Sequence, residues 1–173
     1  MVDVVFLIDS SDSTTQTDFQ KAIIFIKQFV TAENVGPTTI RVSVVSFAAQ
    51  PHLNFPLGLH TDRTSLLFAL EGVGRLQGST DTAKALNFAK LNSFADGGGK
   101  KVVVVITGGN SDDLYETDVA AQSLRSDGVT IFSVAMGQSS LFEQNKIAGN
   151  RANIMTNLDF STFHDAFNKL STC

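Results

Sequence analysis

Continuous runs of valine and isoleucine constrain the fold of this chain more than any other feature. Residues 100–107, KKVVVVIT, and residues 3–9, DVVFLID, are apolar at nearly every position instead of alternating with polar residues. Strands with this pattern are buried on both faces, which is typical of a parallel sheet covered by helices on each side. The two runs therefore predict an α/β fold in which residues 102–107 lie inside the sheet and not at its edge.

The rest of the chain alternates between helical and strand patterns. Helices are expected at 17–32, 62–73, 80–95, 116–126 and 139–148, followed by a last helix with Phe160, Phe163, Phe167 and Leu170 on one stripe. Further strands are expected at 39–47, 128–136 and 152–156, with a short antiparallel edge strand at 51–57, which has a proline at each side. This alternation predicts a doubly wound, mostly parallel sheet with helices on both faces.

Length and charge restrict the organisation and the partners of the chain. With 173 residues it has the size of one domain, so residues 1–173 are expected to form a single unit. The net charge of −4 and the lack of a Lys/Arg run argue against binding to nucleic acid or an anionic membrane. No apolar run reaches the ~20 residues that span a bilayer. Because strand-like sequence follows Met1 directly, the chain is interpreted as a domain excised from a longer protein.

The single cysteine, Cys173, is the last residue. One interpretation is a free thiol on a frayed end. The other is half of a disulfide whose partner precedes Val2 or lies in another chain, which would indicate an extracellular parent protein. Because the termini of a domain often lie close together, we predict a disulfide with a cysteine N-terminal to Val2 in the native, longer chain.

Sequence motifs of enzymes are missing. No G-x-G-x-x-G follows the first strand, and the glycines at 97–99 precede a strand, so they cannot form a phosphate loop. There is no G-x-S-x-G segment. His52, His60 and His164 are scattered along the chain and are interpreted as surface or packing residues. Without a set of nucleophile, base and oxyanion donors, no catalytic activity is expected.

A cluster of hydroxyl and carboxylate side chains follows the first strand, within VFLIDSSDSTTQ at residues 5–16. In Asp9-x-Ser11-x-Ser13, alternate residues of a turn would direct their oxygens toward one point. Such hard oxygen ligands suit Mg²⁺. The alternative is that these side chains cap the following helix. Because sites in such folds lie at the carboxyl ends of the strands, the cluster is expected to meet the segment ITGGNSDD at 106–113.

Three segments together resemble the von Willebrand factor A domain. They are DVVFLIDSSDS at 3–13, GSTDTAKAL at 78–86 and VVVVITGGNSDD at 102–113. The third segment is most similar to the A domains of collagen VI-type matrix proteins. The resemblance covers essentially the whole chain, and it implies the Rossmann-like, doubly wound fold of this family.

The resemblance also implies a metal-ion-dependent adhesion site built from three loops. It assigns Asp9, Ser11 and Ser13 in the first loop and Thr80 in the second as metal ligands. The third loop of the family supplies an aspartate, but this chain has Gly108 at that position. Binding of Mg²⁺, or of Mn²⁺ or Ca²⁺, is therefore expected to be weak or absent, because a lost coordinating partner typically costs ~10–100-fold in metal affinity.

Two outcomes for this site stay open. In one, the site is degenerate and holds metal weakly or not at all. In the other, Asp12, Asp112 or a water takes the place of the missing aspartate. If the site binds weakly, as expected, replacing Gly108 by aspartate should strengthen Mg²⁺ binding by roughly tenfold or more. Tight binding by the natural sequence would instead indicate that Asp12 or Asp112 has taken over the role.

The resemblance implies a function as well. It indicates a secreted, non-enzymatic adhesion or matrix-assembly module of the extracellular matrix. The expected partners are collagen or another matrix protein and neighbouring A domains, with an acidic group of the partner completing the metal shell. The alternative is a structural spacer that packs against neighbouring domains without metal.

Overall fold

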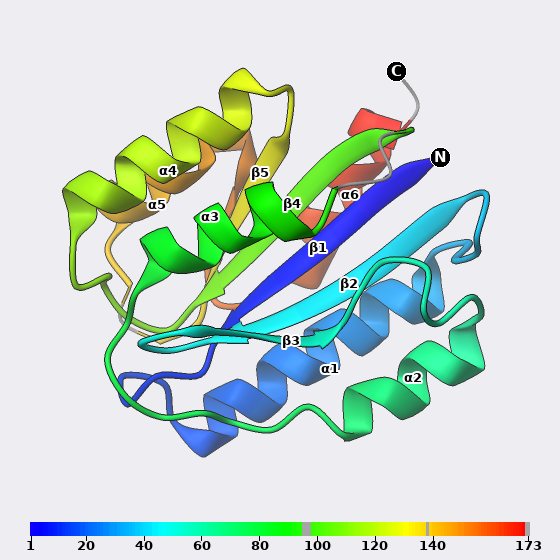
Figure 1. Ribbon diagram of the computed structural model, residues 1–173, viewed down its shortest axis with the longest axis horizontal. Coiled ribbons are helices and arrows are strands. Elements are labelled where there is room, and N and C mark those ends of the chain that lie inside the picture. Colours follow the sequence, from blue (N-terminus) through cyan, green and yellow to red (C-terminus); the bar gives the residue numbers. More distant parts are fainter. Residues whose placement is uncertain (95–97, 138, 172–173) are drawn as a thin grey trace.

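A mostly parallel sheet forms the centre of the computed structural model, which describes residues 1–94, 98–137 and 139–171 (Figure 1). Within these residues the sheet has six strands in the order β3-β2-β1-β4-β5-β6. The strands are β1 (Val2–Asp9), β2 (Ile40–Phe47), β3 (Pro51–Phe55), β4 (Lys100–Thr107), β5 (Thr130–Ala135) and β6 (Ile154–Met155). Strand β3 pairs with β2 in the antiparallel direction, and the other pairs of strands are parallel.

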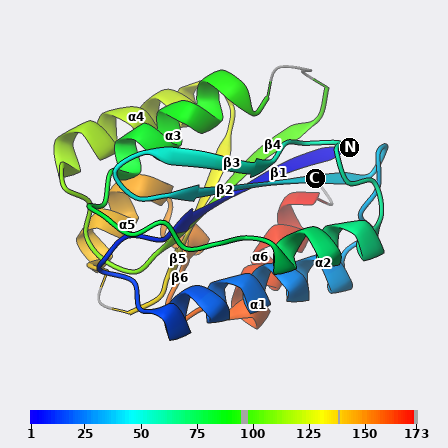
Figure 2. The same ribbon diagram turned by 60° about the horizontal axis from the view of Figure 1, so that its bottom comes forward.

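Helices cover both faces of this sheet (Figure 2). They are α1 (Gln16–Ala32), α2 (Arg63–Glu71), α3 (Thr82–Asn92), α4 (Leu114–Ser126), α5 (Leu141–Ala148) and α6 (Phe160–Ser171). Helices α1, α2 and α6 pack on one face, and α3, α4 and α5 pack on the other. The predicted fold class, including the antiparallel edge strand, is therefore confirmed.

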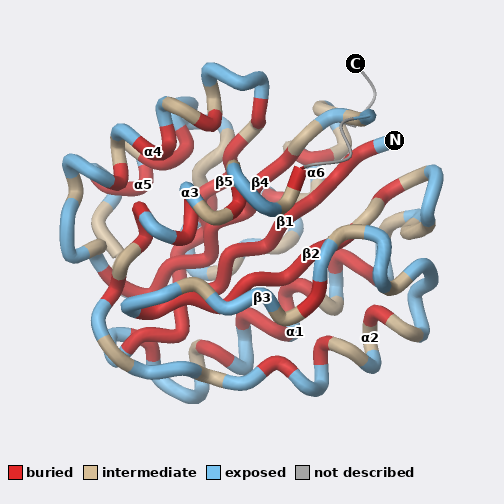
Figure 3. Tube along the Cα trace, in the orientation of Figure 1, coloured by how far each residue is buried: buried red, intermediate tan, exposed pale blue. Residues whose placement is uncertain are grey.

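The two apolar runs form the middle of the sheet, as predicted. Every residue of β1 is buried, and so is every residue of β4 from Val102 to Thr107 (Figure 3). Strand β4 lies between β1 and β5, so both of its faces are covered by helices and both of its edges are paired. Burial on both faces explains why these segments are continuously apolar.

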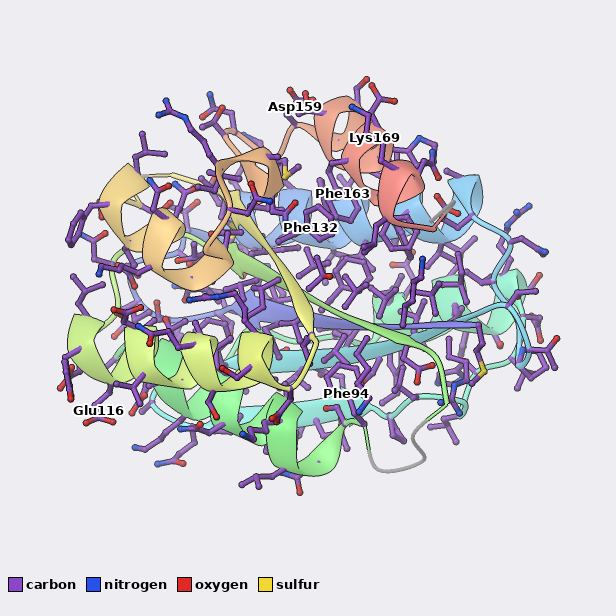
Figure 4. The ribbon with its side chains drawn as sticks, turned by 90° about the horizontal axis from the view of Figure 1, so that it is seen from above. Phe94, Glu116, Phe132, Asp159, Phe163 and Lys169 are labelled. Carbon is purple, nitrogen blue, oxygen red and sulfur yellow. The ribbon has the colours of Figure 1, made fainter. Side chains whose placement is uncertain are left out.

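Aromatic side chains fill the space between the sheet, α1 and α6. The ring of Phe163 lies 5.2 Å from that of Phe132, and the two side chains point toward each other (Figure 4). Phe29 makes edge contacts with Phe6 at 5.3 Å and with Phe167 at 5.0 Å. The stripe predicted on the last helix therefore anchors α6 to the sheet through its phenylalanines.

Some predicted bounds differ from the structure, for reasons of capping. The helix expected over 80–95 begins at Thr82, because the side chain of Asp81 accepts the backbone N–H of Lys84 and caps it. Thr80 is thereby left in the preceding loop. The 3₁₀ helix η1 (Arg151–Asn153) was not predicted, and its first turn is held by the Asn150 side chain.

Lys100 connects the two ends of the described chain. Its backbone N–H donates to the carbonyl oxygen of Met1 at 3.1 Å, and its Nζ donates to that of Leu170 at 2.7 Å. Met1 and Leu170 therefore lie at the same end of the sheet. Cys173 lies outside the described residues, so its pairing stays a prediction.

Candidate metal centre

The strand order of the sheet reverses between the carboxyl ends of β1 and β4. These strands are neighbours, but the chain continues from β1 toward β2 and β3, and from β4 toward β5 and β6 (Figure 1). Ligands of open α/β sheets bind where the strand order reverses in this way. The loop after β1, the loop after β4 and the segment 72–81 all reach this point.

Three hydroxyl groups from two of these segments converge there. Ser11 Oγ lies 2.8 Å from Ser13 Oγ and 2.8 Å from Thr80 Oγ1, and Ser13 Oγ lies 3.3 Å from Thr80 Oγ1. We call Ser11, Ser13 and Thr80 the hydroxyl triangle. Octahedral Mg²⁺ with ligands at about 2.0–2.1 Å separates neighbouring oxygens by roughly 2.9 Å, so the triangle matches one face of that octahedron. Hydrogen bonds among the three hydroxyls give similar separations.

Asp9 places a buried negative charge next to the triangle. Its Oδ1 accepts the backbone N–H of Ser11 at 2.9 Å, and its Oδ2 accepts that of Gly108 at 3.0 Å. The residue is fully buried. Because a carboxylate has about four acceptor positions, these two bonds leave room for further contacts to a cation or its water. Asp9 therefore joins the first loop to the third and supplies charge at the same time.

The aspartates named as substitutes stand at the rim of the site. The backbone N–H of Asp12 donates to Gly78 O, and that of Asp112 donates to Thr80 O, each at 2.8 Å. Both aspartate residues are exposed. The segment that carries Thr80 is thus hydrogen-bonded to the first and to the third loop, and each of these loops has an exposed carboxylate close to it.

Gly108 is in close contact with Thr14. A Cβ atom at Gly108 would lie 2.3 Å from Thr14 Oγ1 and 3.2 Å from Thr14 Cβ, and a Cβ at Gly109 would lie 2.7 Å from Ser13 Oγ. Real Cβ contacts are longer than 3.0 Å, so an aspartate at 108 requires Thr14 to move. The expectation that Gly108→Asp strengthens Mg²⁺ binding stays a prediction, and the variant would have to displace the Thr14 side chain.

Helix α5 fixes the third loop through residues that the sequence analysis missed. The buried carboxylate of Glu143 accepts the backbone N–H of Ser111 with both oxygens, at 2.8 and 3.0 Å. The side chain of Asn110 accepts the backbone N–H of Ser140 at 3.0 Å. The spacing Ser140-x-x-Glu143 signals a capping box, in which the glutamate bonds its own helix. Here the glutamate bonds the distant loop instead, and no local pattern indicates that.

Arg75 lies against the first loop and was also missed. Its Nη2 donates to Ser11 O at 3.0 Å, and its Nε is buried with no hydrogen-bond partner among the described residues. A positive charge at this place opposes cation binding nearby.

Within the described residues, neither the histidines nor other side chains away from the triangle form a second candidate metal site. His60 packs edge-on against Phe55, and His164 stacks on Phe160 and lies 2.9 Å from Glu33, as expected for packing residues. Across residues 1–94, 98–137 and 139–171, no group of three or more His, Cys, Asp or Glu side chains is placed to hold a metal. Over the same residues, no helix is long and apolar enough to cross a membrane.

Comparison with known proteins places the chain in a family. The profile of the VWA, or von Willebrand factor type A, domain matches residues 3–169. Bovine von Willebrand factor A domain-containing protein 1 is 33% identical over 82% of this chain and 35% of that protein. Bovine matrilin-1 is 30% identical over 98% of this chain and 32% of that protein. The mouse collagen alpha-5(VI) chain is 30% identical over 91% of this chain and 6% of that protein. The chain therefore spans about a third or less of these relatives.

Solved structures share the fold. Proximal thread matrix protein 1 from the mussel byssus, with a zinc-occupied MIDAS motif, has a TM-score of 0.84 and 24% identity, covering 98% of this chain and 44% of that one. Manganese-loaded TRAP protein from Plasmodium vivax has a TM-score of 0.83 and 18% identity, covering 96% and 73%. These identities support a common fold alone. Together with the match over residues 3–169, the fold shows that this chain belongs to the von Willebrand factor type A domain family, with similarity to the A domains of collagen VI chains.

Proposed function

We propose that this domain is a non-enzymatic adhesion or matrix-assembly module, which binds an acidic group of a protein partner at the hydroxyl triangle with a weakly held divalent cation. The observation that carries the proposal is the convergence of Ser11, Ser13 and Thr80 beside the buried Asp9. Hydroxyl and carboxylate oxygens are the ligands that Mg²⁺ and Mn²⁺ accept.

The charge of the site supports weak cation binding. The three triangle hydroxyls would hold the cation, and Asp9 would balance half of its charge from beside Ser11. When bound, the cation supplies a fixed positive charge that attracts a carboxylate of the partner. Mg²⁺ loses its water reluctantly, so a site with a single anion holds it poorly. The carboxylates of Asp12 and Asp112 at the rim are the candidates to add charge.

The relatives support a matrix protein as the partner. They include a collagen VI chain and a thread matrix protein from the mussel byssus, and the latter binds zinc at its MIDAS motif. By analogy, we expect this domain to work in the extracellular matrix as part of a secreted protein. Its partners would be collagen or another matrix protein, and neighbouring A domains.

A binding role fits the site better than catalysis. The Ser11 hydroxyl contacts two other hydroxyls, Ser13 and Thr80. The carboxylate beside it, Asp9, already accepts two backbone N–H groups. A nucleophilic serine requires an adjacent base that can take its proton, and these contacts do not supply one.

The alternative is a spacer domain that binds no metal. The glycine at position 108 favours it, because the third loop then brings no acidic side chain to the site at that position. A spacer would keep the fold and the hydrogen-bonded loops, and its contacts with neighbours would not depend on a cation.

Binding to immobilised collagen VI and collagen I, in MgCl₂ or in EDTA, separates the two functions. We expect Mg²⁺-dependent binding that the double variant Ser11→Ala/Ser13→Ala abolishes. Ser79→Ala is the matched control, because it removes an exposed hydroxyl next to Thr80 but outside the triangle. Binding that is equal in MgCl₂ and in EDTA for all variants would support the spacer. Failure to bind either collagen in MgCl₂ would contradict the proposed collagen partner.

A further inference from the structure

Helices α4 and α5 present exposed apolar side chains next to the third loop. We call this surface the α4–α5 face; its residues are Tyr115 and Val119 on α4, and Leu141 and Phe142 at the start of α5. Between 45% and 74% of each of these residues is exposed. A single exposed apolar residue is ordinary on a protein surface, whereas a cluster of them marks an interaction site.

An ion pair joins the two halves of this face. Lys146 Nζ on α5 lies 3.2 Å from Asp118 Oδ2 on α4, and the two helices lie side by side (Figure 1). Asp118 follows Tyr115 by three residues and directly precedes Val119, whereas Lys146 follows Phe142 by four. Because side chains three or four residues apart are neighbours on a helix, the ion pair lies between the apolar residues of α4 and those of α5.

The third loop connects the α4–α5 face to the hydroxyl triangle. The backbone N–H of Asp112 donates to Thr80 O at 2.8 Å, and α4 begins two residues later. The side chain of Asn110 accepts the backbone N–H of Ser140, the residue directly before α5, at 3.0 Å. A partner that reaches the triangle across the third loop therefore meets the start of both helices.

The border of the face is acidic. Residues 102–124 contain four carboxylate side chains and no lysine or arginine. One of the four, Asp118, is balanced by Lys146. The other three are exposed: Asp112, Asp113 and Glu116. Figure 4 shows Glu116 at the first turn of α4. Three carboxylates outweigh the partial charge of about +0.5 at a helix N-terminus, so this surface attracts a basic group.

Lys146 shows how the face holds such a group. Its Nζ lies 5.7 Å from the centroid of the Phe142 ring and pairs with Asp118, so a cation has an aromatic ring and a carboxylate beside it. Tyr115 offers the same surroundings, since its ring is exposed and Glu116 follows it directly. Among the described residues, no lysine or arginine stacks on Tyr115.

We propose that the α4–α5 face binds an arginine or lysine side chain of the same protein partner whose acidic group binds at the triangle. The aliphatic stem of this side chain lies on Tyr115 and Phe142, and its charge faces Asp112 and Glu116. The partner is therefore a protein segment with an acidic and a basic residue close together. The presence of both groups in one partner rests on the proposed function, whereas binding of the basic group does not require the cation.

NMR titration of the ¹⁵N-labelled domain with N-acetyl-arginine amide tests the face separately. We expect saturable shifts of the amide signals of residues 112–119 and 141–146, equal in MgCl₂ and in metal-free buffer. N-acetyl-norleucine amide, which has an uncharged aliphatic side chain, should cause no saturable shifts. Tyr115→Ala should weaken binding of the arginine amide by roughly two- to fivefold, on the scale of an exposed cation–π contact. Tyr115→Ala/Phe142→Ala should abolish it.

Phe68→Ala is the matched control, because it removes an exposed ring from α2, on the other face of the sheet, and should leave binding unchanged. The inference is overturned if the arginine amide causes no saturable shifts at the face, if the norleucine amide causes equal shifts, or if the shifts survive in Tyr115→Ala/Phe142→Ala. The shifts should persist in Ser11→Ala/Ser13→Ala. Arginine binding without a Mg²⁺ response at the triangle would contradict the proposed function alone, and the reverse result would contradict this inference alone.

Discussion

Asp9 has two roles: it holds two loops together, and it supplies the buried charge of the site. Its two oxygens accept backbone N–H groups from the first and third loops, so it holds the loops together. The same carboxylate supplies the buried charge beside the hydroxyl triangle. Removing it should therefore reduce stability and cation binding together.

Asp9→Asn tests whether Asp9 both holds the two loops together and supplies the charge of the site. The amide retains the shape but cannot accept from both N–H groups, so one buried donor loses its partner. We expect the free energy of unfolding in urea to fall by about 1–3 kcal/mol. Mg²⁺ binding measured by calorimetry should be lost. Asp12→Asn, at an exposed carboxylate of the same loop, should change stability by less than about 0.5 kcal/mol. A variant of Asp9 with unchanged stability would show that its hydrogen bonds are not needed.

The charge of Arg75 gives a second test at this scale. Because the guanidinium contacts Ser11 O, it places a positive charge near the site. We expect Arg75→Gln to tighten Mg²⁺ binding by roughly two- to tenfold, on the scale of an incompletely screened charge. Arg75→Lys keeps the charge and should show no such gain in the same calorimetric titration. Equal affinities for the two variants would mean that the charge of Arg75 does not act on the cation.

The side chain of Asp159, the residue directly before α6, caps the start of this helix. The carboxylate of Asp159 accepts the backbone N–H of Thr162 at 3.0 Å and its hydroxyl at 2.6 Å. The Thr162 hydroxyl, and then its N–H, lower the pKa of Asp159 below the ordinary value of 3.8. A lowered pKa in the folded state means that the ionised carboxylate favours folding. Its contribution is full above the ordinary pKa and is lost as the pH falls through the lowered value.

Asp159→Ala should therefore destabilise the domain at neutral pH but not in acid. We expect the urea midpoint to fall at pH 7, with faster amide hydrogen exchange in residues 160–163. The difference from the natural sequence should shrink as the pH falls through the lowered pKa of Asp159, because the carboxylate is then protonated in both states. Asp165→Ala, at an exposed carboxylate of the same helix, is the control. A difference that persists unchanged into acid would exclude the capping carboxylate as its cause.

The elements could be predicted where one physical cause dominates the local sequence. Burial on both faces makes β1 and β4 continuously apolar, so their place in the sheet was predictable. The start of α3 was misplaced, because a single capping side chain, Asp81, decides it. For the site, the pattern Asp9-x-Ser11-x-Ser13 indicated which oxygens could converge. The contact of Thr14 with Gly108 could not be predicted, since it depends on how closely two loops from distant parts of the chain approach each other.

At the scale of the whole molecule, the site and the chain ends lie apart. The triangle is at the carboxyl ends of the parallel strands, whereas Met1 and Leu170 meet at Lys100, at the amino end of β4. A partner bound at the triangle would therefore not contact Met1 or Leu170.

The position of the ends supports the predicted disulfide. Because Met1 and Leu170 both contact Lys100, a cysteine shortly before Val2 would stand close to the end of α6. In the full-length protein, we expect non-reducing peptide mapping to recover Cys173 linked to such a cysteine. Recovery of Cys173 as a free thiol would contradict the pairing. Reduction with matched alkylation is the control that identifies the linked peptide.

The central claim is that a divalent cation binds weakly at the hydroxyl triangle. Titration of the ¹⁵N-labelled domain with Mn²⁺ tests it most directly, because the paramagnetic ion broadens the amide signals close to it. The account predicts saturable broadening of residues 9–14, 79–81 and 108–110, competed by Mg²⁺ and lost in Ser11→Ala/Ser13→Ala but not in Ser79→Ala. Broadening that does not saturate at these loops, or that survives the double variant, would contradict it.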